Sequence, residues 1–432
     1  MSVTYSAAVA AIHALPRLAK TGGHERILAL LGALGDPQTR GRFVHVTGTN
    51  GKGSTANAIA HILTASGLTV GLFTSPFIMR FNERLMIDAT PIADADLVTA
   101  YTATADALAQ LQAQDAAFGV TEFEFITAMA FWWFDHVGVD CAVIEVGIGG
   151  DTDSTNVITP LVSVITSVGL DHAALLGHTL TSVATHKAGI IKPGRPVVTA
   201  ALAPEAAAAI ATRVAAMGST WLVAGRDFDA HAGRLQGWGQ TFTYRDEDGP
   251  QKGLQLPLVG PYQLTNAALA IRASKLAAAA MHWPLRLREI RQGLAASTWP
   301  VRMERVSEDP LIVLDGAHNP EGIRGLVDTL QQVFGHQPLT LIVGILADKD
   351  VATMITLLAH TPYRLWLVPV PDTPRAEALS DYPQHAQLQT FETWQAALAA
   401  HLATAREDPV VIAGSLYLVS AVRQTLLGNE TA

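Results

Sequence analysis

Short apolar stretches rich in β-branched residues alternate with helix-length segments along the first half of the chain. These stretches are residues 43–47, 69–73, 141–146, 161–166 and 196–200. Buried parallel strands are apolar at consecutive positions and need crossover connections, which are usually helical, so this order predicts βαβ units. The expected fold class is therefore α/β, built on a doubly wound, mainly parallel sheet.

Residues 233–258 follow a different pattern. Gly237, Gly239, Gly249 and Gly253 interrupt them, and stretches such as 240–245 alternate apolar with polar positions. Alternation with period two is typical of antiparallel strands that are exposed on one face. We expect an antiparallel hairpin appended to the parallel sheet.

A domain boundary is expected close to Pro300. Two Ala-rich helical patterns, residues 262–281 and 287–296, precede it, and the residue before a proline is disfavoured in a helix. Beyond it, strand and helix patterns alternate again, with strands expected at residues 311–314, 339–346, 364–370 and 410–413. The sequence thus predicts a first domain at residues 1–297 and a second, smaller Rossmann-like α/β domain at residues 298–432.

The first strand leads into a glycine-rich turn at residues 48–54, followed by a helical pattern. Strand, glycine-rich turn and helix are the context of a P-loop, in which backbone N–H groups and a lysine, here Lys52, bind phosphates. The match is a variant, because Val46 stands where the strict pattern has glycine and Gly53 stands where it has Ser or Thr. The alternative is a plain glycine-rich turn, but a lysine inside the cluster favours phosphate binding.

Three further strand ends carry polar side chains, namely Ser75, Glu145 and His172. Carboxyl ends of parallel strands meet at one edge of a sheet, so these residues are expected near the phosphate loop. A carboxylate that closes an apolar strand is costly unless it is paired or binds a cation, and Mg²⁺ bound to ATP phosphates is such a cation. The alternative for Glu145 is a structural bond to nearby backbone amides.

Lys187 lies near the end of a helical pattern. From its chemistry alone, a lysine at a helix C-terminus is a solvated charge that interacts favourably with the helix dipole.

Composition excludes several classes of protein. The 432 residues are 49% hydrophobic and 16% charged, which suits a globular chain. The net charge of −9 argues against a broad nucleic-acid-binding face. We find neither a secretory signal pattern nor an apolar run of about 18 residues, so we expect a cytoplasmic protein without a membrane partner. The single cysteine, Cys141, is expected to be a buried strand thiol.

The chain resembles the folylpolyglutamate synthase and dihydrofolate synthase family, which is related to the Mur ligases. The resemblance covers nearly the whole chain. It rests on residues 47–54, 74–76, 121–124, 145–150, 170–172, 187–190, 302, 315–320, 344–350 and 414–417, which match the family's motifs in order.

This resemblance implies a ligase that adds L-glutamate to the γ-carboxylate of a reduced folate through an acyl phosphate. It implies that the ATP phosphates and nucleotide are bound by Thr49, Asn50, Gly51, Lys52, Gly53, Ser54, Asn266, Arg302 and Asp315. Mg²⁺ would be bound by Ser75, Glu145, His172 and Lys187, and Lys187 matches a lysine that is carbamylated in the family. Folate would contact Phe77, Arg84 and Phe123, and the incoming glutamate and transferred phosphate would contact His318 and Ser415. ATP would lie between the two domains.

Two positions depart from the family pattern. Asp151 stands where the family often has arginine, and His186 stands where glutamate usually precedes Lys187. The first departure weakens the case for dihydrofolate synthase activity.

Three alternatives stay open at the level of sequence. One is dihydrofolate synthase activity, alone or as a second activity. Another is a more distant Mur-type amino-acid ligase. The third is a nucleotide-switched binding protein, although such a protein has no need for Arg302 and Asp315 to reach ATP. His318 is either a catalytic group or a residue that only fixes the turn at 316–320. We expect a monomer that acts on ATP, folate and L-glutamate; the preferred folate and the chain length made are not encoded in recognisable motifs.

Overall fold

The computed structural model describes residues 3–17, 23–382, 388–405 and 407–428. The chain separates into two compact units, which we describe one at a time. The first comprises residues 1–231, 242–255 and 265–297, and the second comprises residues 232–241, 256–264 and 298–432. Two short segments that the sequence analysis placed in the first domain thus belong to the second unit.

The first unit is built on an eight-stranded sheet with the order β4-β3-β2-β5-β1-β6-β7-β8. Its six strands from β2 to β8 in that order are parallel, whereas β3 pairs antiparallel with β2, and β4 with β3. The strands are β1 (Phe43–Thr47), β2 (Val70–Phe73), β3 (Leu85–Ile87), β4 (Thr90–Pro91), β5 (Cys141–Glu145), β6 (Val162–Ile165), β7 (Val197–Thr199) and β8 (Trp221–Val223). The predicted doubly wound sheet is confirmed; the antiparallel edge formed by β3 and β4 was not predicted.

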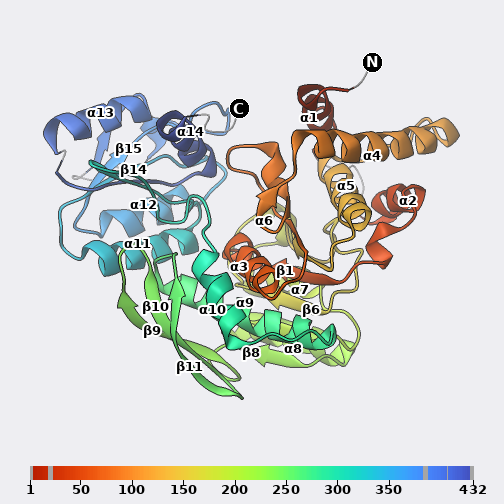
Figure 1. Ribbon diagram of the computed structural model, residues 1–432. Coiled ribbons are helices and arrows are strands. Elements are labelled where there is room, and N and C mark those ends of the chain that lie inside the picture. Colours follow the sequence, from red (N-terminus) through yellow and green to blue (C-terminus); the bar gives the residue numbers. More distant parts are fainter. Residues whose placement is uncertain (1–2, 18–22, 383–387, 406, 429–432) are drawn as a thin grey trace. The chain divides into compact units, whose positions relative to one another are not determined.

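Helices cover both faces of this sheet, which explains why β1 is buried at all five positions. On one face, Phe43, Phe73 and Ile144 join a core with α1, α2, α4 and α5 (Figure 1). On the sheet, α3 packs on β1, β2 and β5, and α10 packs on α3. The helices are α1 (Tyr5–His13), α2 (Glu25–Ala33), α3 (Lys52–Ala65), α4 (Asp94–Gln114), α5 (Glu122–Val137), α6 (Ala173–Leu176), α7 (Leu180–Ala188), α8 (Pro204–Met217), α9 (Pro261–Ala280) and α10 (Leu287–Ala296).

Residues 229–256 form a separate three-stranded sheet with the order β11-β10-β9. Its strands are β9 (Asp229–Leu235), β10 (Gln240–Asp246) and β11 (Gly249–Leu256). The prediction of one hairpin appended to the main sheet is therefore wrong. In β10, alternate residues are buried, namely Gln240, Phe242, Tyr244 and Asp246. This alternation indicates a strand, but it does not indicate which sheet the strand joins.

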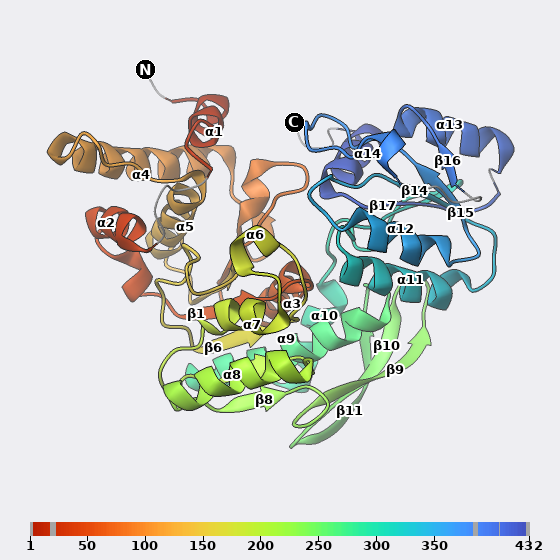
Figure 2. The ribbon, with the colours of Figure 1, turned by 180° about the vertical axis from the view of Figure 1, so that it is seen from behind.

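The second unit contains a six-stranded sheet with the order β12-β13-β17-β14-β15-β16, parallel except for β12. Helices α11 and α12 share one core with it, and α13 lies on the other side of the sheet (Figure 2). There the ring of His401, in α13, lies 6.1 Å from that of Trp366. The elements are β12 (Glu304–Glu308), β13 (Leu311–Leu314), α11 (Pro320–Phe334), β14 (Thr340–Val343), α12 (Val351–Ala359), β15 (Arg364–Leu367), β16 (Leu388–Thr390), α13 (Trp394–Thr404), β17 (Val410–Ala413) and α14 (Leu416–Leu427). This confirms the predicted second α/β domain.

Cys141 and His45 are two of the buried titratable side chains within the main sheet. Cys141 begins β5 and is a free thiol whose pKa burial raises to about 12. His45, in the middle of β1, is fully buried, and desolvation lowers the pKa of its imidazole to about 3. The burial of Cys141 agrees with the expectation of a buried strand thiol. No helix in the described part of the chain is long and apolar enough to span a bilayer.

A substitution at Gly293 tests the importance of the contact between α10 and α3 for stability. A Cβ atom at this position would lie 2.5 Å from Ile62 Cα and 2.6 Å from His61 O, both backbone atoms that cannot rotate away. We expect Gly293→Ala to lower the free energy of unfolding of this unit by about 1–3 kcal/mol, because the two helices must separate. Urea denaturation followed by circular dichroism measures the change.

The control is Gly32→Ala, another glycine within a helix, where an added Cβ meets no atom within 4 Å. Stability should stay constant or rise by up to about 1 kcal/mol, since alanine favours the helix. Equal losses in both variants would show that the contact between α3 and α10 is not the cause.

Candidate active site

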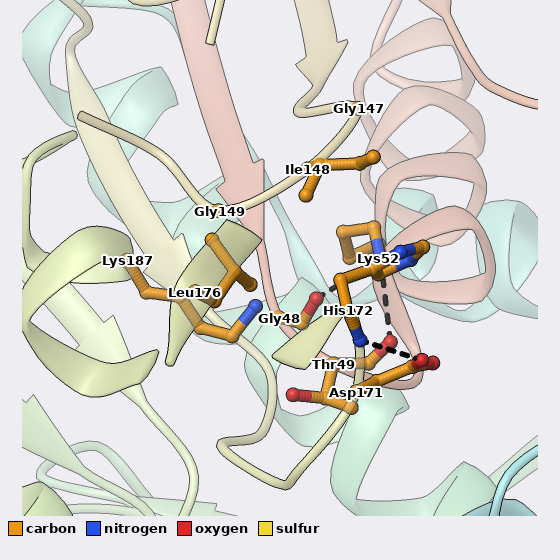
Figure 3. Close-up of a pocket in the computed structure, with 10 residues that line it drawn as sticks. All are labelled: Gly48, Thr49, Lys52, Gly147, Ile148, Gly149, Asp171, His172, Leu176 and Lys187. Carbon is orange, nitrogen blue, oxygen red and sulfur yellow. Dashed lines mark hydrogen bonds between the residues drawn. The ribbon is translucent and has the colours of Figure 1, made fainter. Parts of the chain in front are cut away.

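A pocket lies where β5, β1 and β6 end side by side. The chain leaves β1 toward β2 on one side, and β6 and β7 extend the sheet on the other, so this is a topological switch point, where α/β sheets bind ligands. Figure 3 shows the residues that line the pocket, which are Gly48, Thr49, Lys52, Gly147, Ile148, Gly149, Asp171, His172, Leu176 and Lys187. They come from the three loops and from α3, α6 and α7.

Side-chain hydroxyl groups hydrogen-bond the predicted phosphate loop, residues 48–54, to the residues that follow β6. Thr166 Oγ1 and Ser167 Oγ donate to the carbonyl of Asn50, at 2.6 and 3.0 Å. Ser167 Oγ accepts from the Asn50 N–H at 2.9 Å, and Thr49 Oγ1 bonds to both backbone groups of Gly169. Thr166 and Ser167 were not predicted as site residues, although their position at the end of a strand next to β1 was a usable signal.

Lys52 begins α3 and lines the pocket. Its Nζ donates to the carbonyls of Gly48 at 2.9 Å and Thr49 at 3.3 Å, so the ammonium is held over the loop. Gly51 precedes the helix with φ of 83°, a left-handed conformation that suits glycine, and a Cβ there would lie 2.4 Å from Asn266 Oδ1. The predicted nucleotide residue Asn266, on α9, therefore lies against the phosphate loop.

Glu145 ends β5 and is almost fully buried. Its Oε2 accepts from the Ser75 N–H at 3.0 Å, which joins the ends of the adjacent strands β2 and β5. The backbone bond that we considered as the alternative thus exists, and it holds the Ser75 backbone next to a buried carboxylate.

A metal ion here would need ligands beyond the protein's acidic groups. Among the described residues, no three His, Cys, Asp or Glu side chains form a cluster that could hold a metal ion. Mg²⁺ in phosphate sites typically takes one or two protein carboxylates and completes its shell with phosphate oxygens and water. One buried carboxylate and a neighbouring serine beside a phosphate loop fit that requirement.

His172 and Asp171 face the pocket from the loop after β6. His172 precedes α6 in a left-handed conformation, with φ of 51°, which is unusual for a residue other than glycine and is frequent at functional sites. The Asp171 carboxylate accepts from the His172 N–H at 2.8 Å. We had not assigned a role to Asp171, although it lines the same pocket as Lys52.

The position of Lys187 shows that its assignment as a solvated helix-end charge, made from residue chemistry alone, was wrong. The side chain is not a solvated charge at a helix end, because the residue is only 2% exposed. It belongs to the last turn of α7 and points into the pocket (Figure 3). The helical pattern located the residue correctly but gave no sign that the loop after β5 covers it.

Phe77 and Arg84, both predicted to bind folate, lie together after β2. The Arg84 guanidinium carbon lies 5.2 Å from the centroid of the Phe77 ring and 5.7 Å from that of Phe81. Burial lowers the pKa of Arg84, opposed by Glu122 and Glu145. Its Nε is buried and has no hydrogen-bond partner among the described residues. A buried, unpaired donor on a cation favours binding of an anion at this place.

Phe123, the third predicted folate residue, lies between the core and the pocket. Its ring is 5.9 Å from that of Phe73. A Cβ on Gly147 would lie 2.8 Å from the Phe123 ring and 3.0 Å from the Asp153 carboxylate, so the ring touches the pocket loop. Asp153 orders that loop by accepting from the Ile148 N–H at 2.9 Å.

Within the second unit, Arg302 and Asp315 are neighbours. Asp315 is 2% exposed and accepts from the N–H groups of Met303 at 3.0 Å and Ala317 at 2.9 Å. Burial raises the pKa of Asp315, and the nearby Arg302 opposes this. Val301 and Met303, on both sides of Arg302, have positive φ angles of 51° and 48°. Such strain is often found at functional sites, and no sequence pattern had indicated it.

His318 and Ser415 follow the adjacent strands β13 and β17 of the second unit. The Nδ1 of His318 lies 2.7 Å from the carbonyl of Gly316, which can only accept, so Nδ1 carries a proton. The turn-fixing bond considered for His318 is therefore present. Ser415 is buried at the start of α14, where its Oγ accepts from the Tyr417 N–H, and the Gly414 N–H donates to Ala317 O. The two strand-end loops are thus joined.

Two family models match the chain. Residues 46–274 match the Mur ligase middle domain, and residues 301–416 match the Mur ligase glutamate ligase domain. The first match covers the phosphate loop and every pocket residue, and the second covers Arg302, Asp315, His318 and Ser415.

Known proteins resemble the chain over its whole length. It is 60% identical to the folylpolyglutamate synthase of Lacticaseibacillus casei over 429 residues, which are 99% of this chain and 100% of that protein. It is 35% identical to the dihydrofolate synthase/folylpolyglutamate synthase of Bacillus subtilis, over 99% and 100% of the two chains. A solved structure of an FPGS-AMPPCP-folate complex superposes with a TM-score of 0.92 at 60% identity, covering 98% of this chain and 100% of that one. The chain belongs to the folylpolyglutamate synthase family within the Mur ligases.

Proposed function

We propose that the protein is an ATP-dependent ligase that adds L-glutamate to the γ-carboxylate of a reduced folate. The observation that carries the proposal is the pocket at the switch point. There Lys52 lies on a phosphate loop, a buried carboxylate and Lys187 are close by, and Phe123 touches the pocket loop. The full-length similarity to folylpolyglutamate synthases supports the choice of substrates.

The reaction needs an activated carboxylate, because a carboxylate resists attack by an amine. Transfer of the γ-phosphoryl group of ATP gives an acyl phosphate, which the amino group of glutamate attacks with release of phosphate. Lys52 stabilises charge on the transferring phosphoryl group, and positioning supplies most of the acceleration. Ser75, Glu145, His172 and Lys187 would hold Mg²⁺, which neutralises phosphate charge when bound.

Folate binding is assigned to the residues that follow β2 and begin α5. The Arg84 guanidinium is held on two phenylalanine rings, and its buried Nε suits a carboxylate of the folate. Phe77 and Phe123 offer flat apolar surfaces to the rings of the substrate. Asn266, Arg302 and Asp315 as nucleotide contacts, and His318 and Ser415 as contacts of glutamate and phosphate, remain predictions.

Dihydrofolate synthase activity is a second candidate. It is favoured by the 35% identical Bacillus subtilis relative, whose name includes both activities. The two reactions share the acyl phosphate chemistry and differ in the substrate, which is dihydropteroate in one and a folate in the other. Rates measured with both substrates separate them.

The proposal includes the localisation, oligomeric state and partners of the enzyme. We propose a cytoplasmic monomer whose partners are the small molecules ATP, folate and L-glutamate, without a nucleic-acid or membrane partner. The net charge of −9 supports the exclusion of nucleic acid.

ADP release by the purified protein should require both a folate and glutamate, and Lys52→Ala should lower its kcat about 100-fold or more, because a phosphate-stabilising cation is lost. A coupled ADP assay measures both effects. Lys252→Ala, which removes an exposed lysine, is the control and should keep the wild-type rate. ADP release that is independent of folate would contradict the function, and a wild-type rate in a folded Lys52→Ala variant would contradict the assignment of the loop.

Glu145→Gln and His172→Ala should each raise the Mg²⁺ concentration needed for half-maximal rate, by about tenfold or more. The glutamine keeps the size and the hydrogen-bond acceptor of Glu145 but loses the charge. Initial rates across a magnesium titration measure the shift. Glu205→Gln, at an exposed position in the first turn of α8, is the matched control. Unchanged magnesium dependence in both site variants would remove these residues from the ligand set.

Lys187→Ala should abolish most of the activity, and a short carboxylic acid in the buffer should restore part of it. The reason is that a carbamate on Lys187 supplies oxygen ligands, which a carboxylate in the space left by the side chain replaces. Carbon-13 NMR of wild-type protein equilibrated with labelled bicarbonate checks the carbamate directly. The carbamate assignment fails if no carbamate signal appears in the folded, ligand-bound protein.

A further inference from the structure

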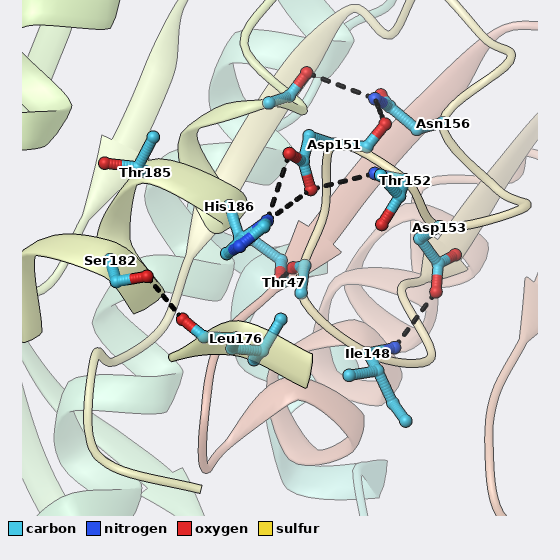
Figure 4. Close-up of polar contacts among 12 residues, drawn as sticks. Thr47, Ile148, Asp151, Thr152, Asp153, Asn156, Leu176, Ser182, Thr185 and His186 are labelled. Carbon is cyan, nitrogen blue, oxygen red and sulfur yellow. Dashed lines mark hydrogen bonds and ion pairs between the residues drawn. The ribbon is translucent and has the colours of Figure 1, made fainter. Parts of the chain in front are cut away.

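The two departures from the family pattern, Asp151 and His186, are in contact. His186 Nδ1 lies 2.8 and 3.0 Å from the two carboxylate oxygens of Asp151, as Figure 4 shows. A carboxylate at neutral pH only accepts, so Nδ1 donates. The backbone repeats the contact, because the Asp151 N–H donates to His186 O at 2.9 Å.

Backbone packing on either side of Lys187 strengthens this contact. A Cβ on Gly150 would lie 2.6 Å from His186 O and 3.1 Å from Lys187 Cα. A Cβ on Gly189 would lie 2.4 Å from Asp151 Cα. The loop after β5 and the end of α7 therefore touch main chain to main chain, and only glycine permits this distance.

Asn156 closes the same contact from the other end of the loop. Its Nδ2 donates to Asp151 O at 3.1 Å and to Gly189 O at 3.2 Å. The end of α7 is thus attached to the loop after β5 at two places. The His186 imidazole bonds to Asp151, and the Asn156 side-chain amide bonds to the Gly189 carbonyl. Lys187 lies between the two attachments.

The loop that holds Lys187 also forms the pocket. Gly147 and Gly149, just before Asp151, line the pocket together with Lys187. A shift of the loop relative to α7 would therefore move the pocket wall and the lysine apart.

We propose that Asp151 and His186 are positioning residues that fix the direction of the Lys187 side chain into the pocket; this rests on the proposed function. Neither residue lines the pocket. Their pair sets the distance between the loop after β5 and the end of α7, and the reaction is sensitive to that distance, because a displacement of about 1 Å can cost about 100-fold in rate.

A surface ion pair without a role is the competing explanation. The side chains of His186 and Asp151 are 30% and 39% exposed, and such pairs often contribute little to stability. The chain contains another His–Asp ion pair, since His231 Nε2 lies 3.0 Å from Asp229 Oδ1 on β9, outside the pocket, and Asp229 Oδ1 accepts no hydrogen bond among the described residues. This second pair provides the control.

The test compares His186→Ala, Asp151→Ala, His186→Asn and the control His231→Ala. Asparagine at position 186 carries an amide N–H close to the place of Nδ1, so it should retain the bond. We expect kcat to fall about tenfold or more in the two site alanine variants, with the KM for ATP changed less than twofold, and to stay near wild type in His186→Asn and His231→Ala.

Hydrogen exchange followed by mass spectrometry gives a readout that does not depend on catalysis. The amides of residues 150–156 and 186–190 should exchange at least tenfold faster in His186→Ala than in wild type, and at the wild-type rate in His186→Asn. If Asp151→Ala does not fold, the comparison of His186→Ala with His186→Asn still tests whether the pair holds the loop.

Two results would overturn the proposal. One is unchanged exchange in His186→Ala, which would mean that the pair does not hold the loop. The other is faster exchange with unchanged kcat, which would mean that the pair only stabilises the fold. If the wild type itself releases no ADP with folate and glutamate, the proposed function fails, whereas the exchange comparison still tests the contact.

Discussion

The candidate site depends on the close approach of polypeptide backbones where β1, β5 and β6 end. A Cβ on Gly48 would lie 1.9 Å from Thr166 Oγ1, and one on Gly150 would lie 2.6 Å from the carbonyl of His186. A side chain at Gly48 would push the loops after β1 and β6 apart, and one at Gly150 would push the loop after β5 away from the end of α7. The glycines are thus required for packing, in the same small region where we propose that backbone N–H groups bind phosphate.

Much of this arrangement could be predicted from the sequence. The apolar runs located the central strands of both large sheets, because strands covered on both faces are apolar throughout. The position of Lys52 within a glycine cluster between a strand and a helix indicated a ligand-binding loop, and Gly48, Thr49 and Lys52 do line the pocket. The rule that parallel strands end at one edge placed Glu145 and Ser75 together, and the 3.0 Å bond between them agrees.

The remaining features depend on contacts between residues far apart in the chain. Lys187 looked like a solvated helix end, since nothing near it in the sequence indicates that a loop 36 residues earlier, at Asp151, covers the helix. Alternation in residues 240–246 indicated strands but not the sheet that they form. The left-handed residues around Arg302 have no sequence signature either, because valine and methionine are poor candidates for that conformation.

The burial of Cys141 in the main sheet makes the protein suitable for selective labelling at introduced cysteines. This residue is the single cysteine of the chain, and its thiol is enclosed at the start of β5 and stays protonated at ordinary pH. Thiol reagents attack thiolates at accessible positions, so the native protein presents an unreactive background. Cysteines introduced at exposed positions, such as Ala109 in α4 and Gln332 in α11, would accept fluorophores selectively. Energy transfer between the two dyes would then report the separation of the two compact units in solution as ATP, folate and glutamate are added.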